Sequence, residues 1–277
     1  MSEQFSVKKY LRDLPLPFCP GCGAMTVMSE FLRAAHELGH EDLGKFVFCS
    51  GIGCSAWIPS PHFMADSVHT LHGRSIPAAT GIKLMHPDVD VVVFGGDGDI
   101  VGIGLSHFIH AARRNLDILV IMVNNMIYGM TGGQVAPTTP LKSKTTTTPY
   151  GSFEHPLDAA RLAVTAGACY VARWTTAQPN ELKESIKKAL GIRGFRFIEA
   201  VSQCPTAFGR RVGFKDAGEM LKWFKENAIP IHQAEKMTEE ALRGKIVVGE
   251  FVQRQRSTLV ENIYKAIEEA QKENEKS

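Results

Sequence analysis

The side chains best suited to bind or transform a ligand lie in two polar turns that each follow an apolar run. The first turn, GGDGD, carries Asp97 and Asp99, and the second carries Asn124 and Asn125. Because ligands of parallel sheets bind beyond the carboxyl ends of the strands, we expect these side chains to lie close together. Carboxylate, amide and carbonyl oxygens suit Mg²⁺ that is also held by phosphates. The two turns therefore predict a magnesium- and phosphate-binding site.

The cysteines form a second group with chemical potential. Cys19 and Cys22 lie in the sequence CPGCG, and such a pair can chelate a metal, carry out redox chemistry or bind an iron–sulfur cluster. A zinc ribbon needs a second close pair, whereas Cys49 and Cys54 are separated by four residues. A thioredoxin-like site follows a strand, and none is predicted before Cys19. A cluster needs further thiolates, which can come from anywhere in the chain.

Apolar patterns place both polar turns in an α/β domain. The β-branched run before Asp97 and the apolar run before Asn124 predict buried parallel strands, joined by a helix between Gly104 and Asn115. Further strands are predicted near residues 45–48, 169–172 and 195–201, and further helices near 25–38, from 77 onwards, 157–166 and 181–190. We therefore predict an α/β fold with a mostly parallel sheet flanked by helices.

The same patterns divide the chain into three parts. We predict an N-terminal arm over residues 1–17, the α/β domain over residues 18–207 and a C-terminal tail over residues 208–277. Within the tail, helical patterns near 217–227 and 257–272 are separated by residues 245–251. Leu259, Ile263 and Ile267 recur every four residues in the last helix, and we interpret this stripe as a docking face for a partner.

Composition argues against several classes of partner. The 277 residues include 31 Lys and Arg and 29 Asp and Glu, which gives a net charge of +2. A charge this small does not indicate binding to nucleic acid or to an anionic membrane. The N-terminus lacks an apolar signal core, and no apolar run approaches the length of a membrane span. We therefore expect a soluble cytoplasmic protein, whose cysteines are metal-bound, catalytic or buried rather than disulfide-bonded.

The spacing of the two polar turns resembles a known cofactor motif. GDG followed after 25 residues by Asn-Asn is similar to the diphosphate-binding motif of thiamine diphosphate enzymes. This resemblance implies that Asp97, Asn125 and the backbone carbonyl of Ile127 hold Mg²⁺.

The cysteine motifs narrow the resemblance to one family. CPGCG, SGIGCS and a late QCP are together similar to the β subunits of 2-oxoacid:ferredoxin oxidoreductases, over about residues 18–210. The resemblance implies that one [4Fe–4S] cluster is held by Cys19, Cys22, Cys54 and Cys204. Cys49 and Cys169 are then interpreted as buried structural thiols.

The resemblance also implies the other site residues. Those expected to line thiamine diphosphate are Ile52, Gly53, Cys54, Ser55, His72, Gly96, Gly98, Asp99, Asn125, Tyr128, Gly129, Met130 and Thr131. His72 and Arg74 are expected to act beside the cofactor, since the fork of an arginine suits the carboxylate of a 2-oxoacid. The threonine-rich segment 135–150 is interpreted either as a lid over the site or as a mobile surface loop.

The reaction implied by the resemblance is the coenzyme A-dependent oxidative decarboxylation of a 2-oxoacid, with electrons passing through the cluster to ferredoxin. An α subunit is expected to supply the glutamate that activates the cofactor's aminopyrimidine, because no pyrimidine-binding half is evident here. The sequence YGMTGGQ looks most like the 2-oxoglutarate branch, with the pyruvate and 2-oxoisovalerate branches as alternatives. Trp57 and Gly132 stand where some relatives carry substrate-contacting lysines, which leaves the carboxylate to Arg74 or to the partner.

Two functions of other classes stay open from the sequence. A non-redox thiamine lyase or synthase subunit would need no cluster and would leave the four matched cysteines unexplained. A zinc- and phosphate-binding module without redox activity would use Cys19 and Cys22 together with a GGDG turn of the kind found in kinases. Iron with acid-labile sulfide, as opposed to zinc, distinguishes the oxidoreductase from this module.

Overall fold

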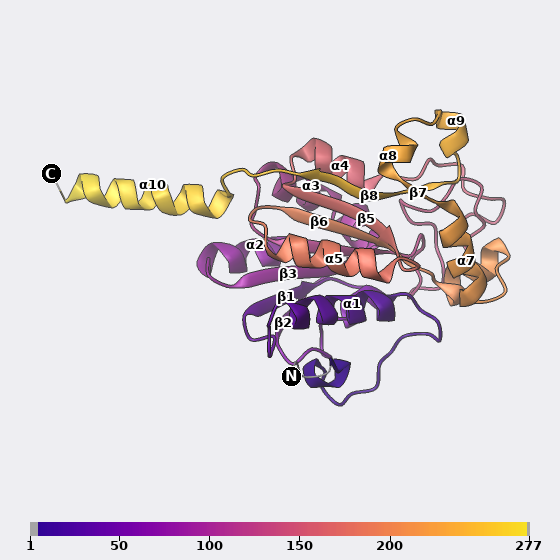
Figure 1. The fold of residues 1–277 in the computed structure, drawn as a ribbon, viewed down its shortest axis with the longest axis horizontal. Coiled ribbons are helices and arrows are strands. Elements are labelled where there is room, and N and C mark those ends of the chain that lie inside the picture. Colours follow the sequence, from indigo (N-terminus) through magenta and orange to yellow (C-terminus); the bar gives the residue numbers. More distant parts are fainter. Residues whose placement is uncertain (1–4, 276–277) are drawn as a thin grey trace.

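An eight-stranded sheet forms the centre of the protein, which the computed structural model describes from residue 5 to residue 275 (Figure 1). The strand order is β2-β1-β3-β4-β6-β5-β8-β7. Strands β1 to β6 pair in parallel, β8 runs antiparallel to β5, and β7 is parallel to β8. The strands are β1 (Phe46–Ser50), β2 (Asp66–His69), β3 (Asp90–Gly96), β4 (Leu119–Asn124), β5 (Tyr170–Thr175), β6 (Arg196–Val201), β7 (Ala228–Pro230) and β8 (Ile246–Gln253). The predicted mostly parallel α/β sheet is confirmed.

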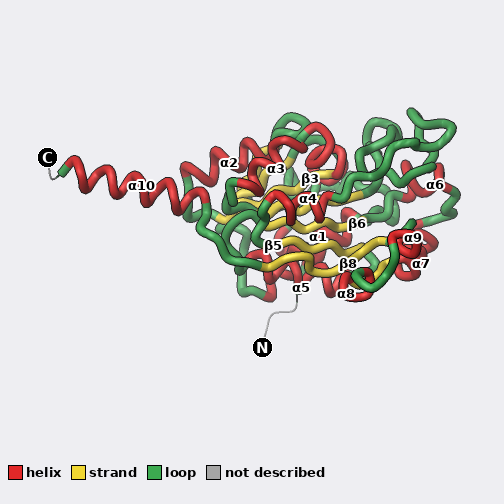
Figure 2. Tube along the Cα trace, turned by 90° about the horizontal axis from the view of Figure 1, so that it is seen from above, coloured by secondary structure: helices red, strands yellow, loops and turns green. Residues whose placement is uncertain are grey.

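Helices cover both faces of the sheet. One face packs on α1 (Ala24–Glu37) and α5 (Pro179–Leu190). The other face packs on α2 (Ser75–Met85), α3 (Leu105–Arg113) and α4 (Ala159–Ala166). Figure 2 shows α2 and α3 on one side of the strands and α5 on the other. Because both faces are covered, every residue of β4 is buried, which is why this central strand is a continuous apolar run up to its terminal asparagine.

Successive residues of the central strands serve the two opposite cores. In β4, Leu119, Ile121 and Val123 join the core under α1 and α5, while Val120 and Met122 join the core under α2, α3 and α4. This alternation follows from the two-residue period of a strand. The edge strand β2 was not predicted, because all four of its residues are exposed and carry no apolar pattern.

Short helical turns connect these elements at the carboxyl ends of the strands. Three of them follow β1, β3 and β6, namely η2 (Cys54–Trp57), the π-helical turn η3 (Gly98–Ile103) and the π-helical turn η4 (Pro205–Gly209), which continues as α6 (Arg210–Val212). A further turn, η1 (Val7–Tyr10), belongs to the N-terminal arm, where Leu11 bridges to Phe63.

The C-terminal segment adds to the sheet and then leaves it. It comprises α7 (Ala217–Asn227), β7, α8 (Ile231–Ala234), α9 (Glu239–Leu242), β8 and α10 (Leu259–Asn274). Because β8 pairs with β5, residues 246–253 belong to the same sheet as the preceding domain. The helix α10 projects from the body of the protein, as both views show (Figures 1 and 2). Within residues 5–275, no helix is both long and apolar enough to cross a membrane.

Candidate cofactor site

The carboxyl ends of β1, β3, β4 and β6 bring the candidate residues to one edge of the sheet. The register pairs Gly96 with Val123, so β3 and β4 end level with one another. Asp97 follows β3 directly, and Asn125 follows β4 directly. The segments SGIGCS and QCP start from β1 and β6, which lie on either side of this pair of strands. The predicted proximity of the two polar turns is confirmed by this strand pairing.

Asp97 is a buried carboxylate, and within residues 5–275 no basic side chain forms an ion pair with it. It is 1% exposed, and the Thr138 hydroxyl donates a hydrogen bond to its Oδ2 atom. Burial raises the pKa of Asp97 to about 7, although the hydrogen bond from Thr138 acts in the opposite direction. A cation bound at this carboxylate would restore the ionised form, because an opposite charge nearby favours it.

The two asparagines have different roles. The Asn124 amide donates to Glu199 Oε1 at 2.7 Å, and its own oxygen accepts the Met126 N–H at 3.0 Å. Asn125 lies in the turn itself, where its Oδ1 atom accepts the Ile127 N–H at 3.3 Å. Met126 has a φ of +62°, which is uncommon for a residue with a side chain and marks a constrained turn. Asn124 therefore anchors the turn to β6, and Asn125 is left beside the carboxyl end of β4.

Tyr128 packs directly on the GDG turn. A Cβ atom added at Gly98 would lie 2.1 Å from the tyrosine ring, and one added at Gly102 would lie 2.6 Å from its hydroxyl oxygen. The hydroxyl donates to the Gly98 carbonyl at 3.2 Å. The Tyr128 N–H also donates to the Gln134 carbonyl at 3.1 Å, which closes a small hairpin over residues 128–134. Glycine at position 98 is therefore required by the approach of this ring.

Asp99 connects the GDG turn to the segments that follow β1 and β2. Its Oδ1 atom accepts the backbone N–H groups of Ile52, at 3.2 Å, and Gly73, at 2.7 Å. His72 Nδ1 lies 2.8 Å from the same oxygen. The Asp99 Oδ2 atom is buried and has no hydrogen-bond partner among the described residues. His72, Asp99 and Ile52 are thus brought together as predicted residues of one site.

The first and last cysteine motifs are hydrogen-bonded neighbours. The Gly23 N–H donates to the Gln203 carbonyl at 3.0 Å, which joins CPGCG to QCP. A Cβ atom added at Gly21 would lie 3.7 Å from Pro205 Cγ, and one added at Gly129 would lie 3.7 Å from Cys204 Sγ. The cysteine motifs therefore lie against the turn that carries Tyr128 and Asn125.

The four predicted cluster ligands share one electrostatic environment. The pKa of Cys22 is raised to about 12, mainly by burial and to a smaller extent by the nearby thiols of Cys204, Cys54 and Cys19. Burial also raises the pKa of Cys54, with smaller contributions from Cys204 and Cys19. Across residues 5–275, no group of three or more His, Cys, Asp and Glu side chains is arranged to hold a metal ion. The four thiols therefore lie near one another and are of the type that binds iron–sulfur clusters, but they are not arranged in the geometry of a metal site.

The remaining cysteines are buried elsewhere. Cys49 and Cys169 are both fully buried, and Cys169 Sγ donates to Asn115 Oδ1 at 3.1 Å. None of the six cysteines is disulfide-bonded. The expectation that these two thiols are buried is confirmed.

Arg74 lies at the exposed start of α2. Its guanidinium donates to the Gly73 carbonyl at 3.2 Å. Burial lowers the pKa of His107, on α3, and the charge of Arg74 lowers it further, which places Arg74 near that helix. A role for Arg74 at a substrate carboxylate stays a prediction.

The segment 135–150 is an ordered cover held by threonines. Thr138 reaches Asp97, and the Thr139 hydroxyl donates to the Met126 carbonyl at 2.7 Å. The Thr146 N–H donates to the Gly133 carbonyl at 2.9 Å, which ties the segment to the 128–134 hairpin. Sequence reasoning missed Thr138, although the threonine-rich composition was a signal. Of the two interpretations of this segment, a lid over the site or a mobile surface loop, these bonds favour the lid, which stays a prediction.

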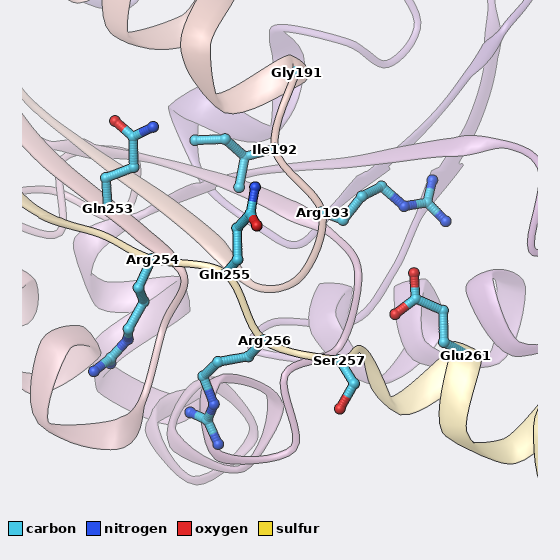
Figure 3. A pocket seen from close by; sticks show the side chains of 9 residues that line it. All are labelled: Gly191, Ile192, Arg193, Gln253, Arg254, Gln255, Arg256, Ser257 and Glu261. Atoms are coloured by element: carbon cyan, nitrogen blue, oxygen red, sulfur yellow. The ribbon is translucent and has the colours of Figure 1, made fainter.

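The pocket drawn in Figure 3 is lined by residues that precede β6 and follow the antiparallel strand β8, so it lies at the opposite end of the strands from the candidate site. It has a volume of about 510 Å³ and is lined by Gly191, Ile192, Arg193, Gln253, Arg254, Gln255, Arg256, Ser257 and Glu261. Its arginines are engaged with the protein itself: Arg254 donates to the Ala168 carbonyl, Arg256 to the Gly167 carbonyl, and Arg193 pairs with Asp117. The pocket therefore surrounds the base of α10 and contains none of the predicted site residues.

Comparisons with known proteins agree with this geometry. The family described as the thiamine pyrophosphate enzyme C-terminal TPP binding domain matches residues 51–200, which run from the end of β1 into the last residues of β6. The fold and the two polar turns thus define a thiamine diphosphate-binding domain.

Similar proteins show to which group of thiamine diphosphate-binding proteins the chain belongs. The chain is 52% identical to the 2-oxoglutarate synthase subunit KorB of Methanocaldococcus jannaschii, over 96% of this chain and 98% of that one. It is 45% identical to the 2-oxoacid:ferredoxin oxidoreductase subunit beta of Saccharolobus solfataricus, over 68% of this chain and 62% of that one. The chain belongs to the family of 2-oxoacid:ferredoxin oxidoreductase β subunits and is a subunit of an oxidoreductase.

A solved structure resembles nearly the whole chain. It is the 2-oxoglutarate:ferredoxin oxidoreductase from Magnetococcus marinus with 2-oxoglutarate, coenzyme A and succinyl-CoA bound. The TM-score is 0.85 at 35% sequence identity, and the match covers 97% of this chain and 91% of that chain. The agreement extends beyond residues 51–200 and so includes regions outside the family domain.

Proposed function

We propose that this chain is the β subunit of a 2-oxoglutarate:ferredoxin oxidoreductase, which oxidatively decarboxylates 2-oxoglutarate with coenzyme A and passes the electrons to ferredoxin. The observation that carries the proposal is the contact between the two chemical motifs: the position of a Cβ on Gly129, in the turn after Asn125, lies 3.7 Å from Cys204 Sγ. A thiamine site beside a thiol site allows electron transfer from one to the other. The KorB relatives and the Magnetococcus marinus structure support the choice of 2-oxoglutarate.

The oxygen ligands at the strand ends fit a magnesium ion with a bound diphosphate. Asp97, Asn125 and the Ile127 carbonyl would hold Mg²⁺, because two of them follow paired strands and Asp97 is a buried carboxylate without a basic partner. The proposed cofactor-lining residues are Ile52, Gly53, Cys54, Ser55, His72, Gly96, Gly98, Asp99, Asn125, Tyr128, Gly129, Met130 and Thr131. Their backbone turns would orient the diphosphate, and Tyr128 would close one side of the site.

The four thiols of Cys19, Cys22, Cys54 and Cys204 fit a [4Fe–4S] cluster. Burial raises the pKa values of Cys22 and Cys54, and the neighbouring thiols add smaller contributions; iron bound by all four sulfurs would offset both effects. When bound, thiamine diphosphate supplies a carbon nucleophile for a keto group, and the cluster accepts electrons one at a time.

The chain's own side chains would bind and orient the substrate. His72 is proposed to act beside the cofactor, and Arg74 is proposed to bind the 2-oxoacid carboxylate from the start of α2. An α subunit is proposed to supply the activating glutamate, and α10 is proposed as a docking helix. We place the complex in the cytoplasm, where six cysteines without disulfides are expected.

One experiment tests the class and the substrate together. The complex is purified without oxygen together with the subunits that copurify, and methyl viologen reduction is measured with 2-oxoglutarate, pyruvate and 2-oxoisovalerate, each with coenzyme A. A brown complex that reduces the dye with 2-oxoglutarate supports the proposal. A brown complex that prefers another acid would correct the substrate, and a colourless zinc protein inactive with all three acids would refute the proposed function.

A further inference from the structure

Asp99 lies at the meeting point of three segments of the proposed site. Its Oδ1 atom accepts the N–H groups of Ile52 and Gly73 and lies 2.8 Å from His72 Nδ1. The carboxylate is 2% exposed, so these contacts are shielded from water. One side chain thus joins the GDG turn, the SGIGCS segment and the segment after β2, which are far apart in the sequence.

The arrangement fixes the proton on His72. A backbone N–H can only donate, so two of the contacts of Asp99 Oδ1 require this oxygen to act as an acceptor. Nδ1 of His72 therefore carries the hydrogen that faces Asp99. In the neutral ring the other nitrogen, Nε2, is then an acceptor. The imidazole also lies edge to face with Tyr128, with 6.0 Å between the ring centres, so its orientation is set on two sides.

The segments around Asp99 approach it closely because glycines, which have no side chain, stand at the contact points. A Cβ added at Gly51 would lie 2.2 Å from Asp99 Oδ2, and one added at Gly95 would lie 2.9 Å from it. Gly73 has a φ of +70°, and its Cβ would lie 2.8 Å from the backbone nitrogen of Gly104. The close approach of three segments to Asp99 thus depends on residues without side chains.

The second carboxylate oxygen of Asp99, Oδ2, is not satisfied by the surrounding residues that the structure describes. It is buried without a hydrogen-bond partner, which costs free energy in any folded protein. An unpaired buried oxygen of this kind calls for an explanation, and the three contacts of Oδ1 offer one.

We propose that Asp99 is a positioning residue that acts through His72. It holds the imidazole in the tautomer whose Nε2 accepts a proton beside Tyr128, and it fixes the spacing of the two segments that carry Ile52 and Gly73. This inference rests on the proposed function, in which His72 acts beside the cofactor.

The variant that tests the inference is Asp99→Asn in the assembled complex. Its amide oxygen can still accept the two backbone N–H groups, but it lacks the negative charge that selects the His72 tautomer. The matched control is Asp88→Asn, an exposed aspartate before β3. We expect Asp99→Asn to lower kcat about 100-fold and to change KM for 2-oxoglutarate less than about threefold, as for the loss of a general acid–base group. At saturating thiamine diphosphate the cofactor should stay bound, and the visible spectrum should match that of the control.

A double-mutant cycle separates positioning from a general structural effect. His72→Gln alone should lower kcat by a similar factor, and Asp99→Asn should have no further effect in the His72→Gln background. Multiplied effects of the two substitutions would overturn the inference, because Asp99 would then act independently of His72. A His72→Gln complex with unchanged kcat would also overturn it, and this result can be obtained even where Asp99→Asn does not fold.

The outcome is distinguishable from failure of the proposed function. The unsubstituted complex must be brown and must oxidise a 2-oxoacid, and its failure to do so refutes the proposed function before any variant is made. When the unsubstituted complex is active, an Asp99→Asn complex with wild-type kcat, or one that loses thiamine diphosphate together with activity, overturns the positioning role alone.

Discussion

Thr138→Val isolates one hydrogen bond to the proposed magnesium ligand. Thr138 is buried, and its hydroxyl donates to Asp97 Oδ2 from the segment that covers the site. Valine keeps the branched shape and the volume of threonine but cannot donate. The substitution therefore removes the donor while the packing of the segment stays nearly the same.

The magnitude follows from the burial of Asp97. A hydrogen bond to a charged group contributes about 1.5–3 kcal/mol, and this one opposes a pKa that burial already raises to about 7. Without the donor, the pKa of Asp97 rises further, so Mg²⁺ must displace a proton from a larger fraction of the carboxylates at neutral pH. We expect Mg²⁺-dependent binding of thiamine diphosphate to weaken about 10- to 100-fold, the range found for outer partners of metal ligands.

The assay is titration of the metal-depleted complex with Mg²⁺ at saturating thiamine diphosphate, followed by protein fluorescence at several pH values. The defect should be larger at pH 6.5 than at pH 8.5, because deprotonation of Asp97 at high pH removes the competition. Thr146→Val is the matched control, since Thr146 is exposed in the same segment. Binding by Thr138→Val within twofold of wild type at every pH, or an equal loss in Thr146→Val, would refute this reasoning.

Three further substitutions test other parts of the site. Asp97→Asn should stabilise the metal-free complex relative to wild type, increasingly as pH rises from 4 to 8 and by up to about 4 kcal/mol. The reason is that a carboxylate with a raised pKa binds more protons in the folded than in the unfolded protein, so its ionisation at higher pH destabilises the wild type. Thermal unfolding measured across this pH range tests the prediction, and a stability difference between variant and wild type that does not change with pH would contradict it. Cys54→Ala should lose iron and visible absorbance, because Cys54 is a proposed cluster ligand, whereas Cys49→Ala should keep both. Iron analysis and a visible spectrum measure this, and the reverse result would show that Cys49, not Cys54, is the third cluster ligand. Gly98→Ala should weaken thiamine diphosphate binding at least tenfold, because its Cβ would lie 2.1 Å from the Tyr128 ring; calorimetric titration with unchanged affinity would show that the ring can move away.

Much of the fold could be predicted because both faces of the sheet are buried. The apolar run predicted as a strand at residues 118–123 corresponds to β4 (Leu119–Asn124), and the helices predicted at 217–227 and 257–272 correspond to α7 and α10. Edge elements are different, because burial does not constrain their sequence. β2 is exposed at all four residues, and β8 lies in a segment whose pairing with β5 depends on contacts from elsewhere in the chain.

The site was predictable only where spacing reflects strand pairing. Asp97 and Asn125 could be matched because each follows a strand directly, and their strands are neighbours. Thr138 could not be assigned, because its contact with Asp97 depends on the path of an irregular segment. The bond between Asp99 and His72 was missed for the same reason, since it depends on how the segment after β2 folds back over the GDG turn.

Buried carboxylates at the two ends of the parallel strands differ in how their charge is offset. At the end away from the site, Asp117 is as buried as Asp97, but Lys83 lies 3.2 Å and Arg196 3.1 Å from its oxygens. Burial acts to raise the pKa of Asp117, yet these positive charges outweigh it and the pKa is lowered. Asp97 is held by a neutral hydroxyl instead, and its pKa is raised. The fold can therefore neutralise a buried carboxylate with its own side chains, and at Asp97 it leaves that charge for a bound cation to offset.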